Sequence, residues 1–162
     1  MHSNIYQISS RPISEDEYAN PSRYEENSGD FADYIGDAYE GEEREEKIKN
    51  FAGVIEDVFT YKGGGEFVYK GKEAMRKFKQ TWIDELQSKV AALTPDNLLK
   101  AQNLFSIGQL TEKTHLDASS RVDIAGWCGE YAYPLGDLFE WADSLLKKGD
   151  RFYIGAVIDY KW

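Results

Sequence analysis

The fold is decided by a long alternating stretch near the C-terminus, Phe152-Tyr153-Ile154-Gly155-Ala156-Val157-Ile158-Asp159-Tyr160-Lys161-Trp162. Apolar side chains recur there at every second position, which is the period of a β-strand. Val157 stands in the other set of positions, so the second face of the strand is partly apolar as well. A strand that is covered on both faces lies inside a sheet, and we therefore expect these residues to form a central strand.

Weaker β signals occur elsewhere in the chain. Residues 5–9 favour a short strand that stops before Pro12, and residues 121–125 favour another. Between them, residues 58–61 and 67–69 are rich in β-branched and aromatic side chains and flank a run of three glycines. That pattern predicts a β-hairpin.

Helical periodicity predicts four helices. Four apolar residues from Ile48 to Val58 are spaced 3, 4 and 3 positions apart, which places them on one helical face. The longest predicted helix spans residues 72–93. A Thr-Pro start predicts the next helix over residues 94–108, and the last follows a proline within residues 134–148.

The predicted elements define one α+β domain. The chain has 162 residues, a length that suits a single domain, and its strands and helices do not alternate as regular βα units. We expect an antiparallel or mixed sheet of about four to six strands with helices packed on one face. Residues 14–41 are expected to form an acidic, loop-rich segment that lies on this domain or extends from it.

The net charge of −10 is distributed unevenly. Residues 1–46 carry 13 acidic and three basic side chains, whereas residues 47–162 carry 16 of each. An acidic region of this kind repels nucleic acid and anionic membranes and attracts basic protein surfaces. We therefore expect no membrane partner, and direct binding to nucleic acid is disfavoured.

The acidic region is the first candidate for a binding surface. Tyrosines are interleaved with its carboxylates, and tyrosine is favoured at interfaces because it combines apolar area with a hydroxyl. The sequence thus predicts a non-enzymatic interaction protein that binds a basic surface of another macromolecule, such as an inhibitor, an immunity-type protein or a nucleic-acid mimic. The residues expected to contact this partner are Asp30, Asp33, Asp37, Tyr39, Glu42, Glu43, Glu45 and Glu46.

A basic stretch offers an alternative function. Six bases and two acids lie between Lys62 and Lys79, and four of these bases fall where a helix is predicted to start. Positive charge there opposes the helix macrodipole, and the free N–H groups of a helix start suit an anion. The alternative is an anion- or nucleic-acid-binding module that uses Lys62, Lys70, Lys72 and Arg76. In a third interpretation, the basic stretch and the acidic region offset each other within the molecule.

An enzyme of unknown class is the last alternative, and the balance is against it. A nucleophilic cysteine needs a base within hydrogen-bond reach, and the sequence spacing shows no such contact. No metal site is predicted because Cys and His are few, and no cofactor because the glycine run lacks the phosphate-loop pattern. The residues to check for a shared pocket are His115, Asp123, Cys128 and Glu130.

The expected location is the cytoplasm. The first residues contain neither the basic nor the apolar region of a secretory signal. No window holds about 18 uncharged apolar residues, so no membrane-spanning helix is predicted. A single cysteine excludes a disulfide framework and fits a reducing compartment.

Overall fold

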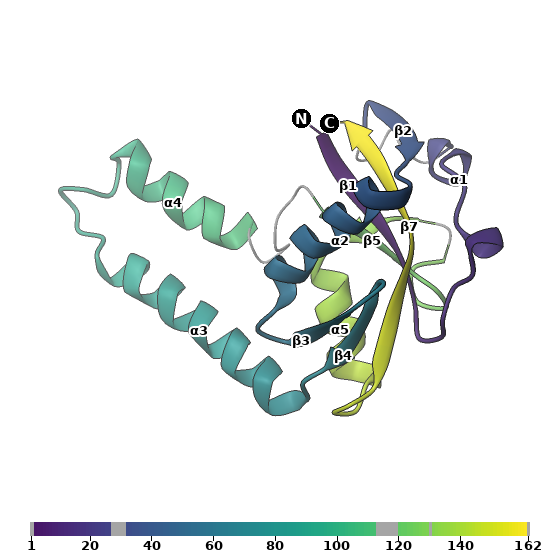
Figure 1. The fold of residues 1–162 in the computed structure, drawn as a ribbon. Helices are drawn as coiled ribbons and strands as arrows, with labels where there is room; N and C mark the ends of the chain where they lie inside the picture. Colours follow the sequence, from purple (N-terminus) through teal and green to yellow (C-terminus); the bar gives the residue numbers. More distant parts are fainter. Residues whose placement is uncertain (1, 27–31, 113–119, 130, 162) are drawn as a thin grey trace.

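Strand β7 (Arg151–Lys161) lies at the centre of the sheet, as its alternation predicts (Figure 1). The structure is a computed structural model that describes residues 2–26, 32–112, 120–129 and 131–161. The other described strands are β1 (His2–Ser9), β2 (Tyr34–Ala38), β3 (Phe59–Gly63), β4 (Glu66–Tyr69), β5 (Ser120–Ile124) and β6 (Tyr133–Pro134). They form a seven-stranded sheet in the order β3-β4-β7-β1-β5-β6, with β2 as a further partner of β7.

The sheet is mixed, and the α+β class is confirmed. Strands β1 and β5 pair in parallel, whereas β7 pairs antiparallel with β1, β2 and β4. The hairpin predicted around the glycine run is the antiparallel pair β3–β4. The described part of the sheet has more strands than the sequence suggests because β2 and β6 are short and show no alternation of their own.

The described helices are α1 (Ser22–Glu25), α2 (Gly41–Ile55), α3 (Lys72–Ala91), α4 (Ala101–Glu112) and α5 (Gly136–Leu145), with a 3-10 turn, η1 (Glu15–Glu17). Helices α2 and α5 bury their apolar stripes in one core cluster with one face of the sheet. Aromatic ring contacts fill this cluster, including the stacked pair Phe67–Phe152 at 4.8 Å and the tilted pair Tyr6–Phe51 at 4.1 Å between centroids. None of these described helices is long and apolar enough to cross a membrane.

The second face of the sheet carries a smaller core. Ile5, Ile158 and Tyr160 point to this side and pack with Tyr24 of helix α1 and Ile35 of strand β2. Both faces of β7 are buried, as the sequence predicts, but a shift in register changes the alternation: Phe152, Ile154 and Val157 lie in the first core, and Ala156, Ile158 and Tyr160 in the second. Part of the acidic N-terminal region is folded onto the sheet in this way.

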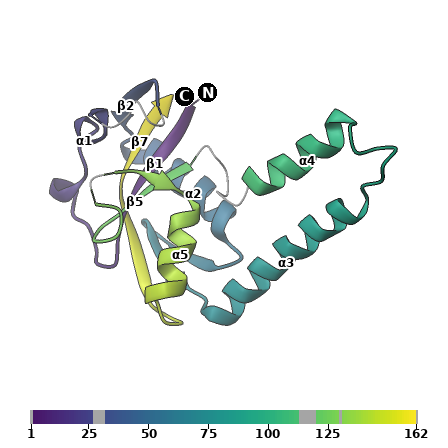
Figure 2. The same cartoon turned by 180° about the vertical axis from the view of Figure 1, so that it is seen from behind.

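Helices α3 and α4 form an arm that projects from the body of the molecule (Figures 1 and 2). Helix α3 is long, yet Met75 in its first turn is its one fully buried residue among those described. Helix α4 begins at Ala101, so the prediction of a helix from residue 94 is wrong. The side chain of Asn97 accepts a hydrogen bond from the Thr94 amide at 2.7 Å and donates one to the Ala92 carbonyl, which stabilises a turn instead.

A bulge in β7 interrupts its pairing with β1, and a side chain at this bulge holds the segment that follows η1. The register shifts between Tyr6 and Ile8, opposite Gly155 and Ala156. The Gln7 side-chain oxygen accepts hydrogen bonds from the amides of Ala156 and Ala19, both at 2.9 Å. A side chain of the sheet therefore holds the chain that follows η1 in place.

Candidate acidic partner-binding groove

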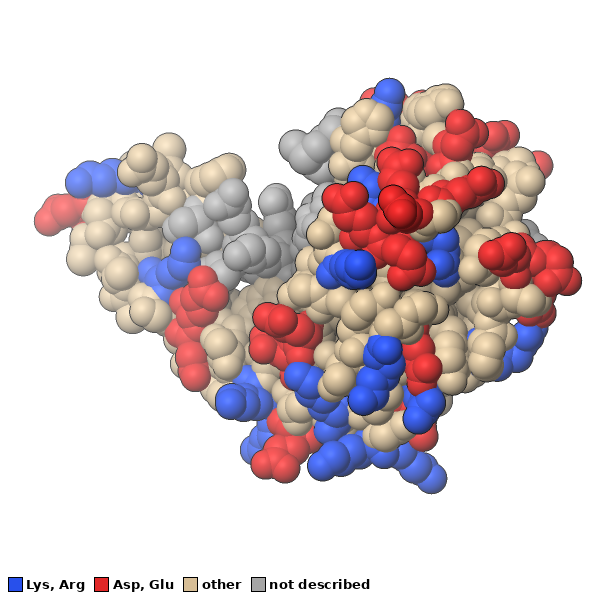
Figure 3. All heavy atoms as spheres, in the orientation of Figure 1, with Lys and Arg blue, Asp and Glu red and all other residues tan. Residues whose placement is uncertain are grey.

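A hollow of about 1290 Å³ lies between the η1–α1 segment and the start of α2. Ala156 of the β7 bulge and Ala38 of β2 also line it. Its charged and aromatic lining consists of five glutamates, two bases and two tyrosines, and we call the hollow the acidic groove; they are Glu15, Tyr18, Tyr39, Glu40, Glu42, Arg44, Glu45, Glu46 and Lys49. Figure 3 shows acidic side chains gathered over this end of the molecule.

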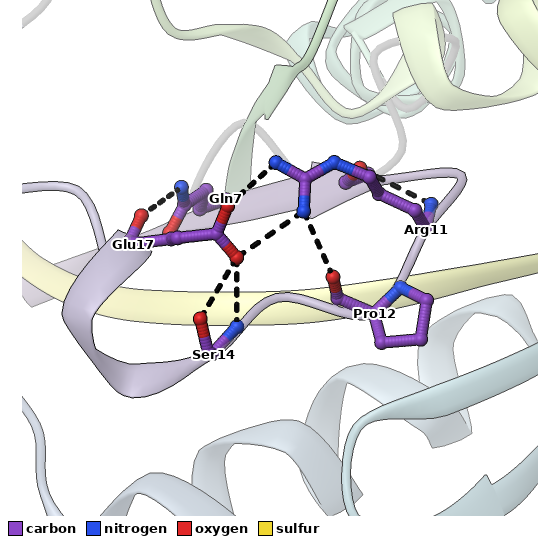
Figure 4. A network of polar contacts seen from close by, with 6 residues as sticks. Gln7, Arg11, Pro12, Ser14 and Glu17 are labelled. Carbon is purple, nitrogen blue, oxygen red and sulfur yellow. Dashed lines mark hydrogen bonds and ion pairs between the residues drawn. The ribbon is translucent and has the colours of Figure 1, made fainter.

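One wall of the acidic groove is held by a local polar network (Figure 4). The Glu17 carboxylate accepts hydrogen bonds from the Ser14 amide and hydroxyl and forms an ion pair with Arg11 at 2.6 Å. These interactions lower the pKa of Glu17 to about 2, with the Arg11 hydrogen bond as the largest cause. The Gln7 amide donates to the Glu17 carbonyl at 3.0 Å, so the wall is attached to β1.

The other wall is the start of α2, which Arg44 attaches to the sheet. The guanidinium donates to the carbonyls of Ile154 at 2.7 Å and Gly155 at 2.9 Å, at the bulge of β7. It also pairs with Glu45 and lies 5.0 Å from the centre of the Tyr18 ring. Arg44 therefore connects α2 and Tyr18 to the bulge of β7. Its side chain is only 11% exposed, so it neutralises little of the charge of the exposed glutamates around the groove.

The outer carboxylates of the groove are not used inside the molecule. Glu15, Glu42 and Glu46 are exposed and form no ion pair with any residue that the structure describes. Carboxylates around one hollow repel one another, and a nearby cation reduces that repulsion. The lining carries more acidic than basic side chains, five against two.

Tyr39 lies at the junction of the groove and the sheet. Its hydroxyl donates to Asp159 at 3.1 Å, and Lys47 lies 4.7 Å from its ring centre. Burial, this hydrogen bond and the negative charges of Asp159 and Glu43 raise the pKa of Tyr39 to about 12. The ring is therefore a neutral, partly exposed aromatic face next to the carboxylates.

Half of the residues predicted to bind a partner line the acidic groove: Tyr39, Glu42, Glu45 and Glu46. Glu43 is exposed on the same helix but is not among the lining residues. Asp33 and Asp37 are exposed beside and on β2, away from the lining, and Asp30 lies outside the described residues.

Five charged or aromatic residues of the groove escaped the sequence analysis: Glu15, Tyr18, Glu40, Arg44 and Lys49. One local signal was available for the first two. Ser14 and Glu17 have the spacing of a capping box, which marks an ordered helical turn at that place. The approach of this turn to α2 depends on Gln7 and the bulge, which no local pattern in the sequence reveals.

The basic candidates lie at a distance from the groove in the fold. Lys62 is on β3, Lys70 donates to the Glu56 carbonyl, and Lys72 and Arg76 are exposed in the first turns of α3. In Figure 3 the basic side chains gather at the end of the molecule opposite the acidic ones. Within the described ranges, no ion pair joins residues 62–79 to residues 15–46, so direct pairing of the two segments is not observed.

The enzymatic candidates do not form a nucleophilic pair among the described residues. Cys128 is buried, and burial, with the charges of Asp123 and Asp137, raises the pKa of its thiol to about 11. Asp123 is also buried, and it accepts a hydrogen bond from Tyr24 at 2.7 Å and pairs with Arg23 at 3.3 Å. His115 and Glu130 lie outside the described residues.

The described part of the chain contains no group of three or more His, Cys, Asp or Glu side chains arranged to hold a metal ion. The comparisons with known proteins bring no relative: no family model, curated protein or solved structure matches this chain. The function is therefore inferred from the sequence and structure of this chain alone.

Proposed function

We propose that this protein is a non-enzymatic interaction protein whose acidic groove binds a basic surface of another macromolecule. The single observation that carries the proposal is the convergence of carboxylates from two separate segments, Glu15 from η1 and Glu42 and Glu46 from α2, around one hollow. The proposed partner presents arginine or lysine side chains, as the target of an inhibitor or a nucleic-acid mimic would. The proposal includes a cytoplasmic setting.

The dimensions and composition of the groove support this proposal. A hollow of about 1290 Å³ accepts several side chains rather than a single ion. Arg44 and Lys47 of the same chain already lie over one face of Tyr18 and of Tyr39, at 5.0 Å and 4.7 Å from the ring centres. A guanidinium of the partner would stack on the other face of either ring, and such cation–π contacts contribute about 0.5–1 kcal/mol at exposed positions. Carboxylates around aromatic faces thus favour arginine, which forms bidentate pairs and stacks at the same time.

A defined basic probe tests the proposal. The probe is a nona-arginine peptide, titrated calorimetrically into the full chain at low and at physiological salt. The test variant is Glu42→Gln/Glu46→Gln. The matched control is Asp84→Asn/Glu85→Gln on α3, which removes the same charge from a helix outside the groove.

We expect the groove variant to bind the peptide about two- to thirtyfold more weakly than the control variant does, because two exposed pairs contribute roughly 0.2–1 kcal/mol each. The difference should shrink as salt is added, since exposed charges are screened. Equal affinities of the two variants would show that the peptide senses only net charge, and the assignment to the groove would then be wrong.

A macromolecular target is tested by capture from the source cell, with the wild type and these two variants as baits. A partner of the groove is retained by the wild type and by the α3 control variant, and lost with the groove variant. A protein captured equally by all three baits is not the partner that we propose.

A further inference from the structure

A second hollow, of about 450 Å³, lies between α3 and α5 at the base of the arm. Its lining is mainly apolar and aromatic, with Phe78, Trp82, Ile83 and Leu86 from α3 and Phe139 from α5. The Phe78 and Phe139 rings stack at 4.9 Å between centroids, so the two helices already touch at this point. The hollow is thus the open continuation of a packed helix–helix contact.

Large apolar side chains remain exposed around this hollow. Ile83 of α3 is 46% exposed and Leu145 of α5 is 61% exposed. Farther along the arm, Leu104 and Phe105 of α4 are also exposed, at 47% and 65%. Exposed apolar side chains beside an apolar hollow are typical of an interaction surface.

The two helices that border the hollow carry opposite charge. The first eight residues of α3 contain four bases and one acid, whereas α5 contains three acids and no base. Inside one molecule they are already joined by an ion pair between Lys79 and Asp143 at 2.6 Å. Arg76 and Glu140 make no ion pair with any residue in the described ranges.

We infer that this surface, the α3–α5 face, binds a second copy of the same chain. A twofold axis that runs along the hollow places α3 of each copy over α5 of the other. The basic helix then meets the acidic helix twice, and the exposed apolar side chains meet across the axis. A face that carries both halves of a complementary pair suits a closed, isologous dimer.

The charge pattern is the reason to prefer a second copy over another kind of occupant. A small apolar molecule would fill the hollow but would leave Arg76 and Glu140 unpaired. A foreign helix would need an acidic side toward α3 and a basic side toward α5. A second copy supplies that arrangement from the residues already present, with no further requirement on composition.

The test is the oligomeric state of the full chain, measured by sedimentation equilibrium over a wide concentration range. The wild type is expected to associate to a dimer. Ile83→Glu should shift the equilibrium toward the monomer, because it places a charge in the apolar contact. The matched control is Val54→Glu on α2, since Val54 is 40% exposed and lies outside the α3–α5 face; it should leave the dimer unchanged.

Charge reversal provides a second test that does not depend on the apolar contact. Arg76→Glu and Glu140→Arg alone should each weaken the dimer by about tenfold, and the double variant should recover most of the loss. A wild type that stays monomeric at every concentration overturns the inference and leaves the face to a different occupant. A dimer that Ile83→Glu and both reversals leave intact also overturns it, because its interface then lies elsewhere. Circular dichroism on each variant verifies that the helices are retained.

Discussion

Replacing Gly155 by alanine is expected to destabilise the protein, although alanine is usually the safer residue in a strand. A Cβ atom at this position would lie 2.5 Å from the Gln7 side-chain oxygen and 3.0 Å from the end of Ile13. The Gln7 side chain must therefore leave its place at the bulge. That movement breaks the two hydrogen bonds it accepts from Ala19 and Ala156 and the one it donates to Glu17.

The magnitude follows from those three hydrogen bonds. Each contributes about 0.5–1.5 kcal/mol, and an amide left without a partner adds its desolvation cost. We therefore expect Gly155→Ala to lower the free energy of unfolding by about 2–4 kcal/mol. The measurement is urea unfolding followed by circular dichroism, with the slope of the transition checked for a change in the denatured state.

A matched substitution in the same chain isolates the cause. Gly53 lies inside α2, and a Cβ atom there meets nothing within 4 Å, so Gly53→Ala should stabilise the protein by about 0.5–1 kcal/mol. In a Gln7→Ala background the cost of Gly155→Ala should fall below about 1 kcal/mol, because the clash is gone. If Gly155→Ala and Gly53→Ala have the same effect on stability, the assignment of Gln7 to the bulge is refuted.

Three further predictions concern single side chains. Arg44→Met should destabilise the protein by about 3 kcal/mol in urea unfolding, because the Ile154 and Gly155 carbonyls lose charge-assisted hydrogen bonds; a loss under about 1 kcal/mol would contradict this role. The pKa of Glu17 is lowered from 4.5 to about 2, so the stability it contributes is present above pH 4.5 and is lost as pH falls through that range; Glu17→Gln should remove this part of the acid sensitivity, seen in urea midpoints measured against pH. The pKa of Cys128 is raised from 9.0 to about 11, so its thiol should be alkylated about a hundredfold more slowly in the native protein than in urea at pH 8, and equal rates would show an accessible thiol.

The elements that the sequence predicts correctly are those in which the spacing of apolar residues shows which side chains are buried. Helices α2 and α5 bury the faces that their helical spacing indicates, and β7 is buried on both faces as predicted. The bulge, which the sequence does not reveal, makes the alternating set of β7 change from one core to the other. Strand β2 was missed because its register depends on a distant contact. A Cβ at Gly36 would lie 2.9 Å from the Asp159 carboxylate, so glycine is needed there for β2 to approach β7.

The arm shows what periodicity leaves undecided. The apolar spacing of residues 72–93 correctly predicts which side chains of α3 share a face. It does not say whether anything in the same molecule covers that face. Along most of α3 nothing that the structure describes buries the stripe completely, and Ile83 and Val90 remain 46% and 49% exposed. Amphipathic spacing is thus equally typical of a helix packed on its own core and of a helix whose apolar face binds another molecule.

The acidic groove was predicted in part for a related reason. The charge of α2 is visible in the sequence, so Glu42, Glu45 and Glu46 could be identified as candidates. Glu15 and Tyr18 join them only because Gln7 bridges the bulge to the chain after η1. A long-range contact made by one polar side chain produces no periodic pattern in the sequence, so it cannot be predicted from such a pattern.

Helix stability alone does not explain the acidity of the groove. Negative charge in the first turn of a helix interacts favourably with the macrodipole, which accounts for Glu42 and Glu43. That effect falls off within one turn, so it does not extend to Glu46, and Glu15 belongs to a different element altogether. Neither of the latter two carboxylates forms an ion pair with a residue that the structure describes, and charge that the fold does not use is a mark of a functional surface. Under the proposed function, a basic partner in the groove offsets this charge, so binding stabilises an arrangement that the fold itself does not require.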